Sequence, residues 1–241
     1  MSDSTTPATR RLGRVQHLLK QIVYGGNDGI VTTFAIVAGY AGAAAEGPEK
    51  IGALAVLVFG LANLVADGVS MGMGEFLSTR SQRDLYRSRR AAGLSRFRAD
   101  PDAGRDEIAG LLAARGLPSE DAAAAARHLS RSPELIEDIR LSYGEGIADM
   151  RLARPVYEGL TTFAAFLVFG IVPLLPYLML EDDHDRALIL SVVATFGALL
   201  GLGLVRWRTT GVGALVAVVE TVGVGALCAA VAFGVGALVG G

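Results

Sequence analysis

The stretch from Tyr24 to Gly47, YGGNDGIVTTFAIVAGYAGAAAEG, carries no charge between Asp28 and Glu46 and is long enough to cross a membrane. A hydrocarbon core about 30 Å thick needs about 20 consecutive apolar residues in one helix. A carboxylate in hydrocarbon is costly, so an acid inside such a stretch predicts a functional group rather than a lipid-facing residue. Asp28 is therefore the first candidate site residue.

The rest of the chain is organised in the same way. Of its 241 residues, 51% are hydrophobic, and they form blocks with the charges gathered between them. This distribution is typical of a polytopic membrane protein and not of a soluble enzyme. The fold class that it predicts is all-α, with five transmembrane helices. The predicted spans cover residues 22–44, 51–78, 156–180, 187–205 and 210–239.

The net charge of −2 gives no reason to expect a nucleic-acid partner. The single cysteine, Cys228, excludes an intramolecular disulfide.

The domain organisation follows from the same blocks. We expect a cytosolic N-terminal segment over 1–21, transmembrane helices one and two over 22–78, a cytosolic helical domain over 79–154 and transmembrane helices three to five over 155–241. The stretch STRSQRDLYRSRR, residues 78–90, is expected to continue the second span as one long helix.

Helix punctuation in the polar segment 79–154 predicts a small three-helix insert between spans two and three. Asp100 and Pro101 are typical of a helix start and Gly116 of a helix end, Ser119 can cap a second helix, and Ser132 precedes a third that ends near Gly144.

Positive charge predicts the orientation. The N-terminal segment holds Arg10, Arg11, Arg14 and Lys20, and the link between spans four and five holds Arg206 and Arg208. The loop after span three, EDDHDR, is acidic. We therefore expect the N-terminus in the cytosol and the C-terminus on the opposite side. The short terminal tails favour a bacterial cell membrane.

The first span has one alternative interpretation. A basic start, an apolar run and the small residues of AGAAAEG could form a secretory signal with its cleavage site. An uncleaved span is the better interpretation, because Asn27 and Asp28 interrupt the apolar region and the whole run is long for a signal.

Polar residues recur along one face of the second span. Asn63, Asp67, Met71 and Glu75 are spaced four residues apart, which places them in one row along a helix. Glu220 interrupts the otherwise apolar fifth span in a similar way.

Three acids are expected at similar depth. Counted at 1.5 Å per residue, Asp28, Asp67 and Glu220 lie roughly 9–15 Å from the cytosolic surface, which predicts one polar cavity. Carboxylates suit hard divalent ions, and the thioether of Met71 adds affinity for softer metals such as Fe(II). Carboxylates also bind protons, which permits exchange of metal for protons.

Four motifs in order carry a family resemblance. GGNDGIVTTFAIVAGYAGA, ADGVSMGMGEFLSTRSQRDLY, VFGIVPLLPYLML and ETVGVGALCAAVAF resemble the first, second, third and fifth spans of the vacuolar iron transporter family. The resemblance covers residues 14–240. It implies five-span homodimers that move Fe(II), and in some members Mn(II), out of the cytosol in exchange for protons.

The resemblance also implies roles for residues. It places the path aspartate at Asp28, the path methionine at Met71 and a glutamate of the fifth span at Glu220. Two family acids before the first-span aspartate fall on His17 and Gln21, and an acid of the second span falls on Asn63.

The insert departs from the family pattern. The resemblance places the family's metal-binding glutamates at Gly93, Arg96, Gly104, Glu107 and Gly144 of this chain. It places the family's methionine pair at Arg140 and Leu141. Only Glu107 keeps a carboxylate. We therefore predict that segment 79–154 binds Fe(II) or Zn(II) no tighter than millimolar.

Together these observations predict a proton-coupled exporter of divalent iron or manganese. It would need no resident cofactor, and its partners would be metal ions, protons, the lipid bilayer and a second copy of the chain. The candidate metal residues are Asp28, Asn63, Asp67, Met71, Glu75, Glu107 and Glu220. One alternative is a family member without transport activity that serves as a membrane scaffold or metal sensor. An intramembrane hydrolase is the other, and no motif pairs two acids for it.

Overall fold

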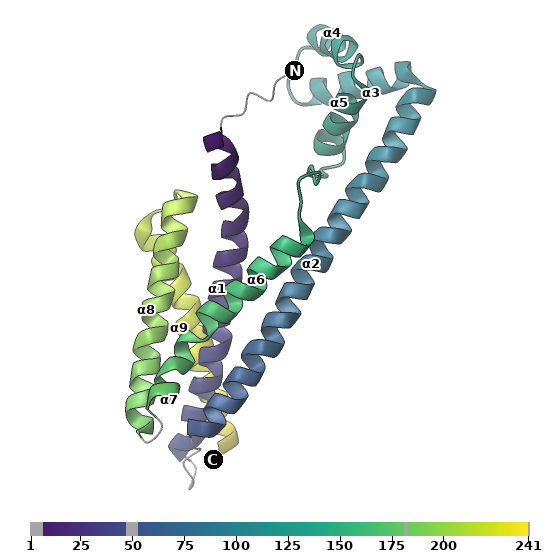
Figure 1. Cartoon of the computed structure of the whole chain (residues 1–241). Helices are drawn as coiled ribbons and strands as arrows, with labels where there is room; N and C mark the ends of the chain where they lie inside the picture. Colours follow the sequence, from purple (N-terminus) through teal and green to yellow (C-terminus); the bar gives the residue numbers. More distant parts are fainter. Residues whose placement is uncertain (1–6, 47–52, 181–182, 241) are drawn as a thin grey trace. The chain divides into compact units, whose positions relative to one another are not determined.

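The computed structural model describes residues 7–46, 53–180 and 183–240 (Figure 1). It is 89% helical and has no strand in these ranges, which confirms the all-α class. The chain divides into two compact units. Unit 1 comprises Met1–Phe76 and Val156–Gly241, and unit 2 comprises Leu77–Pro155.

Unit 1 is built from long helices and two short helical segments. They are α1 (Pro7–Glu46), the first part of α2 (Ala53–Ala99), α6 (Pro155–Gly170), the short 3₁₀ turn η2 (Val172–Leu174), α7 (Leu175–Met179), α8 (His184–Thr210) and α9 (Ala214–Gly240). The 47 residues of α2 form one unbroken helix, about 70 Å long at 1.5 Å per residue. The prediction that residues 78–90 continue the helix of the second span is confirmed.

Four helical segments among the described residues have the length and hydropathy to cross a membrane. They are Leu54–Ala99, Pro155–Met179, Asp185–Thr210 and Ala214–Gly240. The first predicted span, 22–44, lies within α1, which is not one of the four. The count of five spans therefore stays a prediction.

The helix that contains the first predicted span begins at Pro7, well before residue 22. The side chains of Arg10, Arg11 and Arg14 lie outside the described part of the structure, as does the loop that contains Glu49 and Lys50. The orientation inferred from these charges stays a prediction.

The middle of α1 is buried among the other helices of unit 1. Ile30 and Val37 are fully buried, and α1 contributes to both apolar cores of the unit. It packs against α8 and α9. In contrast, α9 exposes large apolar side chains such as Leu215 and Leu238. A polar residue on the buried side of α1 therefore meets protein, which is where intramembrane acids are tolerated.

Small residues allow α1 and α9 to approach closely. A Cβ atom at Gly236 would collide with the backbone carbonyl of Gly39, and one at Gly240 would collide with Ala43. Without side chains between them, the two backbones gain contact along their length.

The third predicted span, 156–180, is not one continuous helix. The helix α6 ends at Gly170, and the turn η2 separates it from α7. Pro173 lies in this turn, and a proline interrupts the helical hydrogen-bond ladder because it lacks an N–H.

Unit 2 packs three further helices and a π-helical turn around the end of α2. They are α3 (Pro101–Ala114), α4 (Ser119–Leu129), α5 (Pro133–Ile139) and the turn η1 (Arg140–Gly144). Phe97, Ile108, Ala126 and Ile136 form the buried apolar core of this unit.

The predicted helix starts at Pro101 and Pro133 are confirmed. The Asp100 carboxylate accepts a bond from the Ala103 N–H at 3.0 Å, and the Ser132 hydroxyl oxygen accepts one from the Leu135 N–H at 3.4 Å. The predicted cap at Ser119 is wrong. Ser119 is the first helical residue of α4 instead, and Pro118 holds the cap position without a side-chain bond.

Candidate metal site

Asp28 lies half-buried on α1, in the part of the helix that other helices surround. The Thr32 hydroxyl donates to the backbone oxygen of Asp28 at 2.7 Å. Among the described residues, no hydrogen bond or ion pair engages the Asp28 carboxylate. The nearby charge that acts on it is another acid, Asp67 of α2. Two like charges in one region attract a cation.

Asp67 is held by a residue of its own helix. The Asn63 side-chain amide donates to Asp67 Oδ2 at 2.7 Å. Both residues are partly exposed, and the bond engages only one of the two carboxylate oxygens. Asp67 therefore keeps an oxygen that can bind a metal ion or a proton.

The carboxylate of Glu75 has partners that the sequence analysis did not foresee. Its Oε1 accepts a bond from the Gln21 amide at 3.3 Å and lies 3.8 Å from the ammonium group of Lys20. Gln21 is buried and ties α1 to α2 at this level. A metal ion at Glu75 would have to compete with the lysine.

Met71 is partly buried and packs against the larger apolar core of unit 1, which includes Leu64 and Phe166. The row predicted from the four-residue spacing places it on the same helix as Asp67, one turn further along. Its sulfur can serve packing and metal binding alike.

Glu220 forms an ion pair that the sequence analysis did not foresee. Arg206 of α8 donates from Nη2 to Glu220 Oε2 at 2.6 Å. The two side chains are 31% and 53% exposed, so water also screens this pair. Glu220 therefore has a cationic partner instead of the other acids of the predicted cavity.

Glu107 belongs to unit 2 and is exposed on α3. It lines a cavity of about 400 Å³ together with Arg96 and Arg140. The lining also includes Asp100 and Glu137, and two hydrogen bonds from Arg140 already occupy the Glu137 carboxylate.

The candidate acids do not form a compact ligand cluster. Within the described ranges, no group of three or more His, Cys, Asp or Glu side chains is placed to hold a metal ion. The structure brings Asp28 and Asp67 into electrostatic contact and gives Glu75 and Glu220 cationic partners. The metal-binding roles of all seven candidates stay predictions.

Asn27 is a candidate that the sequence analysis missed. Its Oδ1 atom is buried and has no hydrogen-bond partner among the described residues, and the same holds for Oε1 of Gln21. Amide oxygens are ordinary ligands for hard divalent cations. The position of Asn27 next to Asp28 was the signal that could have identified it.

Known proteins resemble this chain over most of its length. The model of the VIT family matches residues 19–237. Vacuolar iron transporter 2 of Oryza sativa subsp. japonica is 34% identical over 90% of this chain and 85% of its own length. Vacuolar iron transporter 1 of the same plant is 30% identical over 90% and 83%. Vacuolar iron transporter 1 of Arabidopsis thaliana is 29% identical over 90% and 84%.

Proposed function

This chain belongs to the VIT family, and we propose that it exports divalent iron, manganese or both from the cytosol in exchange for protons. The family is one of membrane-embedded metal transporters, so the chain is not assigned an enzymatic activity. The choice between iron and manganese, the proton coupling and the direction are the parts that we propose.

The arrangement around Asp28 carries this proposal. A carboxylate without a hydrogen bond or ion pair among the described residues lies on a helix surrounded by protein, next to the buried, unpartnered oxygen of Asn27. The second carboxylate, Asp67, acts on it electrostatically. Such a site attracts a divalent cation, and protons can replace the cation on the same oxygens. Met71 would favour transition metals over Mg(II).

The proposal includes the topology and the assembly. We propose five spans with a cytosolic N-terminus and a cytosolic three-helix insert. The metal path would then run along α1 and α2 from the cytosolic side of the membrane to the opposite side. An open apolar groove of about 860 Å³, lined by Tyr40, Phe59 and Val235 among others, supports a homodimer in the membrane. A bacterial cell membrane remains part of this proposal, although the relatives above come from plants.

Transport by the purified protein in liposomes tests the proposal. Fe(II), Mn(II), Co(II) and Zn(II) are offered separately, with and without an imposed pH gradient, and metal and proton fluxes are recorded together. We expect Fe(II) or Mn(II) flux that the gradient drives and that is absent from empty liposomes. Metal flux that ignores the gradient would remove the proton coupling from the proposal.

The alternative of a family member without transport activity has one observation in its favour. Two of the predicted acids, Glu75 and Glu220, have the cationic partners Lys20 and Arg206. The same liposome assay separates the two functions, because a scaffold or sensor would bind metal without moving it.

A further inference from the structure

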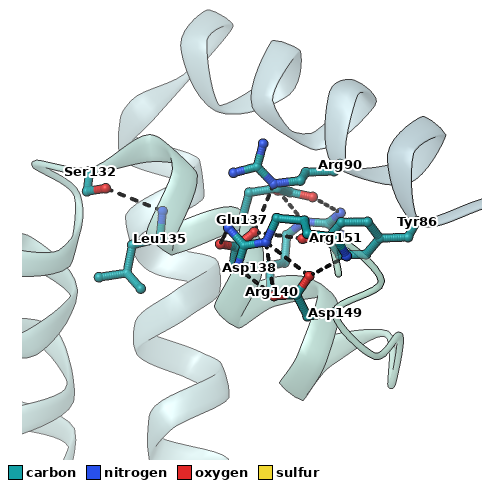
Figure 2. Close-up of polar contacts among 9 residues, drawn as sticks. All are labelled: Tyr86, Arg90, Ser132, Leu135, Glu137, Asp138, Arg140, Asp149 and Arg151. Carbon is teal, nitrogen blue, oxygen red and sulfur yellow. Dashed lines mark hydrogen bonds and ion pairs between the residues drawn. The ribbon is translucent and has the colours of Figure 1, made fainter. Parts of the chain in front are cut away.

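A cluster of ion pairs lies in unit 2, and its Glu137 and Arg140 side chains are buried (Figure 2). Glu137 is 1% exposed, and Arg140 grips its carboxylate with two hydrogen bonds, from Nε at 2.9 Å and from Nη2 at 2.6 Å. The third nitrogen of the same guanidinium donates to Glu145 Oε1 at 2.5 Å. One guanidinium therefore lies between two carboxylates and uses all three of its nitrogens.

The neighbouring acids are engaged in the same way. Asp138 accepts bonds from the Tyr86 hydroxyl at 3.1 Å and from Arg90 Nε at 2.9 Å, and it lies 3.1 Å from Arg151 Nη1. Arg151 also binds Asp149 at 2.6 Å. Each acid of the cluster thus has at least one arginine partner.

The residues of unit 2 do not fit a metal cluster at the positions that the family resemblance indicates. A Cβ atom at Gly93 would collide with the Glu137 carboxylate, and one at Gly104 would collide with the Phe97 ring. A longer acidic side chain at either place would require Glu137 or Phe97 to move. Arg96 contributes a positive charge, and Glu107 is exposed.

We propose that the Arg140 guanidinium is a built-in cation that takes the place of a metal ion in unit 2. Its two carboxylate partners carry two negative charges, and Arg140 together with Arg89, whose Nη1 lies 4.0 Å from Glu145 Oε2, balances them. A divalent cation therefore meets no uncompensated charge there. A guanidinium keeps its proton throughout the physiological range, so it cannot be lost as a metal can.

A consequence is that the arginine conceals a cation site. Without Arg140, Glu137 and Glu145 would present their carboxylates to one vacated space that faces the cavity near Glu107. Oxygen ligands of this kind bind Mn(II) when water completes its coordination. Loss of the arginine should therefore create metal binding instead of only unfolding the unit.

The experiment measures Mn(II) binding to the full-length protein in detergent, by the loss of the free Mn(II) electron paramagnetic resonance signal. All variants carry Asp28→Asn, so that the site in unit 1 contributes little and equally. We compare the parent with Arg140→Ala, with Arg140→Ala/Glu145→Gln and with a control, Arg105→Ala, which removes an arginine from the exposed Asp102 pair.

We expect Arg140→Ala to bind one Mn(II) per chain in unit 2, with an affinity at least about tenfold higher than that of unit 2 in the parent. Removal of a positive charge a few ångströms from the ion changes the binding free energy by more than this factor requires. The Glu145→Gln change should remove the gain, and Arg105→Ala should show none. Mn(II) should also raise the unfolding temperature of Arg140→Ala and leave that of the parent unchanged.

Arg140→Gln serves as a second variant because it is uncharged and can still hydrogen-bond to Glu137, so that it folds more readily than Arg140→Ala. The proposal is overturned if neither variant gains Mn(II) binding. It is also overturned if the parent already binds Mn(II) in a manner that Glu137→Gln abolishes.

Discussion

Asp28 of unit 1 is a half-buried acid and Glu137 of unit 2 is a fully buried one, and their surroundings are opposite. No hydrogen bond or ion pair engages the Asp28 carboxylate among the described residues, and its charged neighbour is another acid. Glu137 receives two hydrogen bonds from Arg140. The first arrangement leaves oxygens available to a cation that comes and goes. The second satisfies them permanently. An open acid therefore suits the proposed path in unit 1, whereas a paired acid suits the fold of unit 2.

The largest expected effect breaks the first side of this comparison. Asp28→Asn keeps the shape of the side chain but removes its charge, and the initial rate of Fe(II) transport in liposomes should fall at least about tenfold, as on loss of a residue that supports a metal ligand. Asp84→Asn, which removes an exposed acid of unit 2, is the matched control and should transport at the parent rate. If Asp28→Asn transports Fe(II) at the parent rate, Asp28 is not a metal ligand and serves only in packing.

The second prediction concerns the close contact between Gly93 and Glu137. Gly93→Ala places a methyl group against the carboxylate, and overpacking of this kind should destabilise unit 2 by about 1–3 kcal/mol. Gly110→Ala is the control, because it also lies within a helix but meets no atom within 4 Å. That change should stabilise by about 0.5–1 kcal/mol. Thermal unfolding and the rate of tryptic cleavage within 77–155 measure both, and equal stability of the two variants would contradict the contact.

The helices could be predicted from the sequence because their signals are local. The caps at Asp100 and Ser132 act on N–H groups three residues away, and the apolar blocks are visible directly. The cap at Ser119 failed because the preceding Pro118 can hold the cap position without any side-chain bond.

The ion pairs could not be predicted in this way. Arg206 and Glu220 meet only because α8 and α9 turn particular faces toward each other, and no spacing within one helix encodes that meeting. The same is true of Gly93, whose missing side chain looked like a lost ligand. The structure shows that Glu137, 44 positions further along, fills the space.

The third prediction tests whether Met71 belongs to the metal site proposed around Asp28 in unit 1. Met71→Leu keeps the volume and apolarity of the side chain, so stability should change by less than about 1.5 kcal/mol. If the thioether contributes to selection, the preference for Fe(II) over Mg(II) should narrow while Fe(II) transport persists. Competition of Mg(II) against labelled Fe(II) uptake measures this. Met73→Leu is the control, since Met73 lies on the same helix but is exposed. An unchanged preference in Met71→Leu would leave Met71 with packing alone.

The smallest expected effect is the loss of stability of unit 2 at low pH, when the carboxylates of its ion-pair cluster become protonated. The hydrogen bond from Arg140 holds the pKa of Glu145 below its ordinary value of 4.5, and the bond from Arg151 holds the pKa of Asp149 below 3.8. A lowered pKa in the folded state stabilises the fold above the ordinary value, and this stabilisation is lost as the pH falls through the folded value. Both carboxylates are partly exposed, at 26% and 45%, so each pair should contribute no more than about 1 kcal/mol. The unfolding temperature should therefore decline modestly below about pH 4.5. Arg151→Gln removes the ion pairs of Arg151 with Asp149 and Asp138. It should show a shallower decline than the parent, because less stabilisation is left to lose. Identical pH profiles for the two proteins would show that Arg151 does not stabilise unit 2 through Asp149.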